Sequence, residues 1–130
     1  MHVGRYTLAA MAIAVALLLG SFVSAADRPF DQKAFEAAQA AGKPILLDVS
    51  APWCPTCKAQ APILKHLSGE PRFKGLVSFG IDFDSQKELL RKFNVQRQST
   101  LIVFKGKQEQ GRSVGDTNAA SIEALLAKGI

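Results

Sequence analysis

The stretch Trp53-Cys54-Pro55-Thr56-Cys57 holds the only two cysteines of this 130-residue chain, and two residues separate them. If a helix begins here, the two thiols come close enough to form a disulfide bond. The Cys54 sulfur then lies at the helix N-terminus, where unpaired backbone N–H groups and the positive end of the helix dipole favour a thiolate. The motif therefore predicts a redox-active pair that alternates between dithiol and disulfide.

Two other uses of a Cys-x-x-Cys pair remain open at this stage. A structural zinc site normally needs four ligands, whereas the chain offers only His2 and His66 beside its two cysteines. A purely structural disulfide would close so short a loop that it would stabilise the fold only a little. We therefore expect no metal and no bound cofactor other than the redox-active disulfide Cys54–Cys57.

The N-terminal residues have the order of a secretory signal peptide. Arg5 precedes the apolar run of residues 8–20, and small residues follow as far as Ala25. We predict cleavage after Ala25, which divides the chain into a signal peptide, residues 1–25, and one domain, residues 26–130. The apolar segment is also nearly long enough to span a bilayer, so an uncleaved anchor is the alternative. In either case we expect an exported, periplasmic domain.

Charge gives little indication of a partner. The chain carries a net charge of +5 at pH 7, with basic residues scattered along the domain and acidic residues between them. A nucleic-acid interface would show a basic stripe with aromatic residues, and the sequence has none. We predict a monomer without a nucleic-acid partner, and a mild preference for acidic partners is the alternative to a solvated surface.

Helical and strand patterns alternate along the domain. We expect helices at residues 31–41, 54–67, 85–93 and 118–127, and strands at residues 44–49, 76–83, 100–104 and 110–114. Asp31 and Ser85 are expected to cap their helices, and Gly106-Lys107 is expected to form a hairpin loop. This order predicts an α/β fold with a central four-stranded mixed sheet flanked by helices.

The motif and this order together resemble the thioredoxin family over residues 30–128. The matching residues are Asp48, Ala51, Trp53, Cys54, Cys57, Lys58, Ala61, Pro62, Phe83, Asp84, Thr100, Val114 and Gly115. The resemblance implies a thioredoxin-like fold and thiol–disulfide exchange. The first strand of the family has little room here, because only residues 26–29 are left for it, so we expect that strand to be short or missing.

The resemblance also implies roles for the central residues. Cys54 looks like the attacking nucleophile, partly exposed, and forms a mixed disulfide with substrate. Cys57, one turn deeper, looks like the resolving thiol. Asp48 corresponds to the buried acid of the family; burial should raise its pKa, and it could take the proton from Cys57. An acid at the strand end facing water is the alternative for Asp48.

A further set of residues is expected to form a substrate-binding rim around the cysteine pair. Its members are Trp53, Pro55, Thr56, Gln98, Ser99, Thr100 and Gly115. A tryptophan packed in the core is the alternative for Trp53. We expect Lys58 and His66 to be solvated residues on the helix surface, and a lysine that favours the thiolate is the alternative for Lys58.

Two positions depart from the family. Ser99 stands where the family normally has a cis-proline, and a cis peptide costs about 3–4 kcal/mol before serine against about 0.5–1 kcal/mol before proline. We therefore expect a trans Gln98–Ser99 peptide, with the Ser99 hydroxyl near Cys54. We also expect Ser99→Pro to change substrate reduction more than stability. Gly80 stands where cytoplasmic thioredoxins carry a lysine, which should make Asp48 harder to ionise.

The sequence thus predicts an exported protein-disulfide reductase. Its expected partners are exported proteins that contain disulfides and a membrane protein that donates electrons. Pro55-Thr56 differs from the Gly-Pro dipeptide of general cytoplasmic thioredoxins. A disulfide-forming oxidase is the alternative enzyme, although such oxidases usually carry a helical insertion for which this chain has no room. A non-catalytic metal-binding or chaperone module that uses the cysteine pair is the alternative of a different class.

Overall fold

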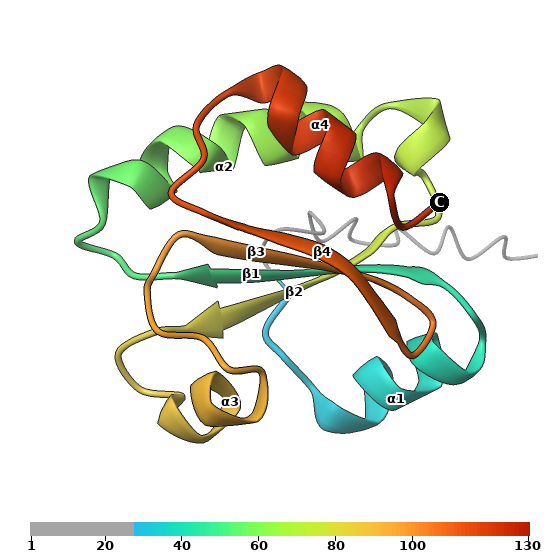
Figure 1. The fold of residues 1–130 in the computed structure, drawn as a ribbon, viewed down its shortest axis with the longest axis horizontal. Helices are drawn as coiled ribbons and strands as arrows, with labels where there is room; N and C mark the ends of the chain where they lie inside the picture. Colours follow the sequence, from blue (N-terminus) through green and yellow to red (C-terminus); the bar gives the residue numbers. More distant parts are fainter. Residues whose placement is uncertain (1–27) are drawn as a thin grey trace, which may run out of the picture.

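The computed structural model describes residues 28–130, and the predicted signal peptide or anchor lies outside them. The elements follow in the order α1 (Gln32–Ala40), β1 (Pro44–Ser50), α2 (Pro55–Ser68), the 3-10 turn η2 (Pro71–Phe73), β2 (Val77–Asp82), α3 (Lys87–Lys92), β3 (Thr100–Lys105), β4 (Gln108–Val114) and α4 (Ala119–Ala127) (Figure 1). None of the helices in this part of the chain is long and apolar enough to cross a bilayer.

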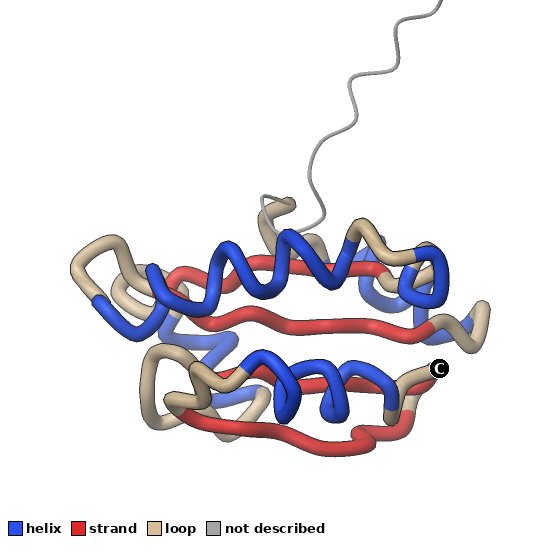
Figure 2. Tube along the Cα trace, turned by 90° about the horizontal axis from the view of Figure 1, so that it is seen from above, coloured by secondary structure: helices blue, strands red, loops and turns tan. Residues whose placement is uncertain are grey.

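The four strands form one mixed sheet in the order β2-β1-β3-β4. β1 pairs with β2 in parallel and with β3 in antiparallel orientation, and β4 is antiparallel to β3. Helices α2 and α4 cover one face of the sheet, and α1 and α3 cover the other (Figure 1). Seen from above, α2 and α4 run along the strands (Figure 2). This confirms the predicted α/β architecture.

Alternation along β1 divides the core into two layers. Leu47 belongs to the cluster that includes Phe35 of α1, on the side of α1 and α3. Leu46 belongs to the cluster that includes Leu64 of α2, on the side of α2 and α4. Asp48 is two residues from Leu46, so it points to the α2 side, beneath the helix that carries the cysteines.

Two predicted element boundaries were wrong. Gln86, not Ser85, is the N-cap residue of α3, and its side chain makes no capping bond. The Ser85 hydroxyl donates to Asp82 Oδ2 at 2.9 Å, and Gln86 Oε1 accepts from Asp82 N at 2.7 Å. Strand β4 begins at Gln108, two residues earlier than predicted, because the tight turn at residues 106–107 pairs Gln108 directly with Lys105.

The expectation for the first strand of the family was correct. Within the described residues it is reduced to a single parallel bridge between Pro29 and Gly80. The backbone of Phe30 donates to Gly80 O at 2.9 Å, and Gly80 N donates to Arg28 O at 2.7 Å. These bonds cover the outer edge of β2 next to the active-site helix.

Candidate active site

Cys54 and Cys57 form a disulfide at the start of α2. Cys54 is the N-cap residue of the helix, with an extended backbone, and its Sγ accepts a hydrogen bond from Cys57 N at 3.1 Å. Pro55 follows at the first helical position, where the missing N–H of proline leaves no helical bond unmade. The motif therefore starts its own helix and places the Cys54 sulfur at the helix N-terminus, as the sequence predicted.

The disulfide is well covered. Cys54 is 1% exposed and Cys57 is 8% exposed; both pack with Ala51, and Phe83 lies against this cluster. The prediction of a partly exposed Cys54 was wrong for this oxidised state. Its sulfur is bonded to the Cys57 sulfur and accepts from Cys57 N, so it lies against the first helical turn and not in solvent.

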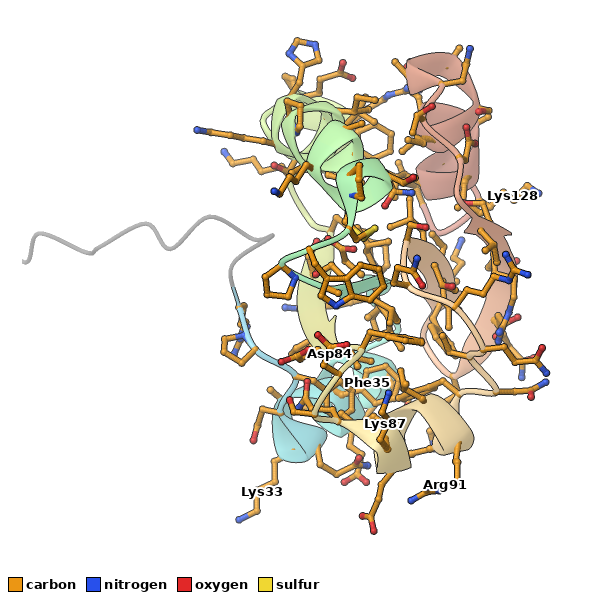
Figure 3. The ribbon with its side chains drawn as sticks, turned by 90° about the vertical axis from the view of Figure 1, so that its left-hand side faces the viewer. Lys33, Phe35, Asp84, Lys87, Arg91 and Lys128 are labelled. Atoms are coloured by element: carbon orange, nitrogen blue, oxygen red, sulfur yellow. A yellow bond between two sulfur atoms is a disulfide. The ribbon has the colours of Figure 1, made fainter. Side chains whose placement is uncertain are left out.

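Trp53 stands on the surface immediately before the disulfide. The side chain is 55% exposed, which excludes the alternative of a core tryptophan. Its indole Nε1 donates to Asp84 Oδ2 at 2.9 Å, and Asp84 N in turn donates to Asp82 Oδ1 at 2.9 Å. Figure 3 looks onto this end of the molecule, with the disulfide near its centre and Asp84 on the loop after β2.

Asp48 lies in the middle of β1, in register with Gly80 on one side and Leu101 on the other. Burial raises the pKa of Asp48 from 3.8 to about 6, as desolvation of a carboxylate predicts. The alternative of an acid at the strand end facing water is therefore wrong. Its neighbour Gly80 contributes no cation that would favour the ionised form.

A cleft of about 530 Å³ opens between α2 and the edge of β2. Cys57, Lys58 and Gly80 line it together with Arg28 and Asp82. Because Gly80 has no side chain, nothing from that position fills the space beside Cys57. The cleft gives solvent a path to the Cys57 side of the disulfide.

Ser99 adopts an unusual backbone conformation. The Gln98–Ser99 peptide is trans, as predicted, but Ser99 has φ +55°, a left-handed value that costs a non-glycine residue about 1–2 kcal/mol. Its hydroxyl donates to Gln98 O at 2.6 Å, so it is already bonded and not free for a Cys54 thiolate. Proline cannot reach this φ, so Ser99→Pro is expected to lower stability as well as to change substrate reduction.

The other predicted rim residues separate into exposed and buried groups. Pro55 is exposed, and Thr56 and Gln98 are half-buried. Thr100 is buried and its Oγ1 donates to Arg97 O at 2.6 Å, so its hydroxyl supports the loop and does not face a substrate. Gly115, with φ +73°, donates its backbone N–H to Ser99 O at 2.9 Å. The structure thus brings Ser99 and Gly115 together.

The two predicted surface residues of α2 lie where they were expected. Lys58 is exposed, and the side chain of His66 is 80% exposed, with its Nε2 3.7 Å from Glu70 Oε1. No group of three or more His, Cys, Asp or Glu side chains within residues 28–130 is arranged to hold a metal ion.

One buried polar residue near the site was missed by the sequence analysis. Gln60 is 1% exposed, and its Nε2 donates to Asp116 O at 2.9 Å and to Ser99 O at 3.3 Å. A signal existed in the sequence: Gln60 interrupts the apolar face of α2 formed by Cys57 and Leu64. Asp84 was among the residues that match the family, but its bond to Trp53, 31 residues away, was not predicted.

The chain resembles known proteins along nearly all of its described length. The family model described as "Thioredoxin" matches residues 26–128. A thioredoxin of Aspergillus fumigatus is 34% identical over 97 residues, which cover 74% of this chain and 87% of that protein. A bifunctional thioredoxin reductase/thioredoxin of Mycobacterium leprae is 35% identical over 92 residues, which cover 71% of this chain but only 20% of the larger protein. The crystal structure of Trxlp from Edwardsiella tarda superposes with a TM-score of 0.74 at 42% identity, over 76% of this chain and 96% of that one.

Proposed function

Because the chain belongs to the thioredoxin family, we propose that this protein-disulfide oxidoreductase works as a reductant of disulfides in exported proteins. The observation that carries the proposal is the Cys54–Cys57 disulfide at the N-terminus of α2. Export is proposed from the signal-like residues 1–25, with the domain free in the periplasm after cleavage or held at the membrane if the segment is retained.

The reaction starts from the dithiol. The Cys54 thiolate attacks one sulfur of a substrate disulfide, and the other substrate sulfur leaves as a thiolate and takes up a proton. Cys57, after losing its proton, attacks the Cys54 sulfur of the mixed disulfide and releases the second substrate thiol. The substrate gains two electrons and two protons, and the protein is left with the Cys54–Cys57 disulfide seen here.

Asp48 is proposed to accept the proton of Cys57. It points to the side of the sheet that α2 covers, and burial raises its pKa to about 6. A base with a pKa slightly below the working pH is ionised in most molecules and still holds a proton well enough to assist its transfer. The cleft is lined by Cys57 and by Gly80, which pairs with Asp48 in the sheet, and we propose that the proton passes to solvent on this side.

Each turnover leaves the protein oxidised, so a donor must return two electrons to the cysteine pair. An exported domain is separated by the membrane from the thiol reductants of the cytoplasm. We therefore propose a membrane protein as the electron donor, with the exchange again passing through Cys54. The domain is proposed to act as a monomer and without a nucleic-acid partner.

The experiment is a trapping assay combined with insulin reduction. Cys57→Ser should accumulate a mixed disulfide through Cys54, because the resolving attack is lost, whereas Cys54→Ser should trap nothing. Neither variant should turn over insulin. If both variants trap partners equally, or if neither does under conditions where the wild type reduces insulin, the assigned roles are wrong.

The direction of the reaction is tested by the reduction potential of the pair. A value close to the ~−270 mV of general thioredoxins supports a reductant, because the disulfide form is then the stable one. A value near ~−120 mV, as in strongly oxidising periplasmic proteins, would instead identify a disulfide-forming oxidase. The potential can be measured against glutathione or dithiothreitol buffers with the quenching of Trp53 as the signal.

A further inference from the structure

Gln60 occupies a position where an apolar side chain would be expected. The buried face of α2 consists of Cys57, Gln60, Leu64 and Leu67, and Gln60 is as thoroughly buried as the core residues around it, at 1% exposure. Burying an amide is unfavourable unless its polar atoms are hydrogen-bonded. A leucine or methionine would fill the same space without that requirement.

The amide of Gln60 is only half satisfied. Its Nε2 donates to Asp116 O at 2.9 Å and to Ser99 O at 3.3 Å, while its Oε1 has no hydrogen-bond partner among the described residues. A buried acceptor left unpaired works against stability. The benefit of a glutamine at this position must therefore lie in what its Nε2 holds.

Both acceptors are backbone carbonyls at the end of the sheet next to the disulfide. Ser99 directly precedes β3, and Asp116 closely follows β4. Thr100, the first residue of β3, pairs with Val114, the last residue of β4. Ser99 O also accepts from Gly115 N at 2.9 Å. One amide group therefore joins the helix that carries the cysteines to the loops on either side of the β3–β4 pair.

The carbonyl of Ser99 belongs to a residue in the left-handed region, with φ +55°. Such a conformation persists only where the surrounding structure fixes it. Two donors on one oxygen, from Gly115 and Gln60, supply part of that constraint. Removing the Gln60 donor leaves Ser99 and the preceding Gln98 freer to turn.

We propose that Gln60 is a positioning residue that sets the Ser99 and Asp116 loops relative to Cys54 for the docking of protein substrates. Its amide is hydrogen-bonded to neither cysteine sulfur among the described residues, and it acts through the two carbonyls that it binds. This inference rests on the proposed reduction of protein disulfides. A protein substrate needs these loops as a docking surface, whereas a small disulfide needs only access to the Cys54 sulfur.

The test compares Gln60→Met with Leu64→Met. Methionine is unbranched and close to glutamine in length, so the first change removes the amide while keeping the volume. The control introduces the same side chain one turn further along the same buried face, away from both loops, and swaps of this kind are well tolerated. Each variant is assayed with insulin and with the small aromatic disulfide DTNB, and amide hydrogen exchange is followed at Gly115.

For Gln60→Met the expected result is a rise of ~3–10-fold in the KM for insulin, the range that one lost hydrogen bond produces. The kcat for insulin and the rate with DTNB should stay within about twofold of the wild type, because the cysteines are unchanged. The Gly115 amide should exchange faster, because the loop that it binds is looser. Leu64→Met should leave the KM, the kcat and the Gly115 exchange rate near their wild-type values.

Three outcomes would overturn the proposal. They are an unchanged KM for insulin, an equal loss with insulin and DTNB, and the same loss in Leu64→Met. If Gln60→Met does not fold, Gln60→Leu replaces it, and failure of both to fold would show that Gln60 is required for the fold rather than for docking. If the wild type reduces neither disulfide, the proposed function fails, but Gly115 exchange still tests the positioning by Gln60.

Discussion

Trp53 and Asp84 are joined by a hydrogen bond from the indole Nε1 to Asp84 Oδ2, at 2.9 Å, across 31 positions of sequence. The bond ties the residue before the disulfide to the loop between β2 and α3. Trp53 is 55% exposed, so the bond holds a large apolar ring in one place on the surface. The neighbouring Phe83 packs against the cysteine cluster, which makes this loop one wall of the site.

Loss of the Asp84 carboxylate should release the indole. Trp53 is the only tryptophan of the chain, so its fluorescence reports this site alone. Asp84→Ala should give a faster anisotropy decay and slower insulin reduction, with a loss of stability of about 1 kcal/mol or less, as for one exposed hydrogen bond. Glu88→Ala, which removes an exposed acid from α3, is the control. An unchanged anisotropy decay in Asp84→Ala would show that the bond does not restrain the ring.

The two cysteines should differ in reactivity once the disulfide is reduced. The Cys54 sulfur caps α2 and accepts the Cys57 N–H, an arrangement that favours its thiolate. Cys57 lies inside the first turn of the helix, away from the cap position. Iodoacetamide at neutral pH should therefore modify Cys54 first, as peptide mass spectrometry can establish. Equal rates, or faster labelling of Cys57, would reverse the roles.

The features that were predictable from the sequence depend on neighbours along the chain. Asp31 accepts from Ala34 N at 2.8 Å as the N-cap of α1, and the Cys-Pro-Thr-Cys segment starts α2; both follow from local preferences. The predicted cap of α3 was wrong because both candidate side chains bond to Asp82 instead: the Ser85 hydroxyl donates to its Oδ2, and Gln86 Oε1 accepts from its N–H.

The features that could not be predicted depend on contacts made only in the folded chain. Gln60 meets Ser99 across 39 positions of sequence, and Phe83 packs against the cluster that contains Cys54 from a distant part of the chain. The absence of a proline at position 99 predicted the trans Gln98–Ser99 peptide. The left-handed φ of Ser99 follows instead from the carbonyl contacts around it, which no local pattern encodes.

Asp48 should make the stability of the fold depend on pH. Burial raises its pKa from 3.8 to about 6, so the folded chain binds this proton more tightly than the unfolded chain. The stabilisation is complete below about pH 4 and is lost as the pH rises through about 6. A pKa difference of this size corresponds to about 3 kcal/mol in the free energy of unfolding.

Replacing the acid by an amide of the same shape removes this dependence. Asp48→Asn should match the wild type near pH 4 and exceed it by up to about 3 kcal/mol near pH 8, measured by urea denaturation. It should also slow the release of substrate from the mixed disulfide, because the proton acceptor for Cys57 is gone. Glu36→Gln, at an exposed position of α1, should show neither effect. If Asp48→Asn raises the free energy of unfolding by the same amount at every pH, the titration of Asp48 is not the cause of the gain.

Export should leave a defined N-terminus. If the signal peptide is cleaved after Ala25, the full-length gene expressed in a Gram-negative host should give a periplasmic protein that begins at Ala26. Intact-mass spectrometry of the fractionated protein decides the point. Recovery of the full-length chain in the membrane fraction would support the uncleaved anchor, and recovery of the full-length chain in the cytoplasm would contradict export.

Ser99 should tolerate glycine better than proline. Glycine reaches a φ of +55° without strain, whereas proline is fixed near −65° and would have to rebuild the loop that Gly115 and Gln60 bind. Ser99→Pro should therefore lower the free energy of unfolding by more than about 1 kcal/mol. Ser99→Ala removes the hydroxyl bond to Gln98 O but keeps the Cβ, so it serves as the matched control for glycine.

The comparison between glycine and alanine isolates the backbone strain. Both variants lose the hydroxyl, and only glycine escapes the left-handed penalty of about 1–2 kcal/mol. The greater entropy of glycine in the unfolded chain reduces this advantage by roughly 0.5–1 kcal/mol. Ser99→Gly should thus be the more stable of the two by up to about 1 kcal/mol, in urea titrations run side by side. A proline variant as stable as the wild type would mean that the backbone at Ser99 does not need the left-handed conformation, and would overturn the assignment of strain to this residue.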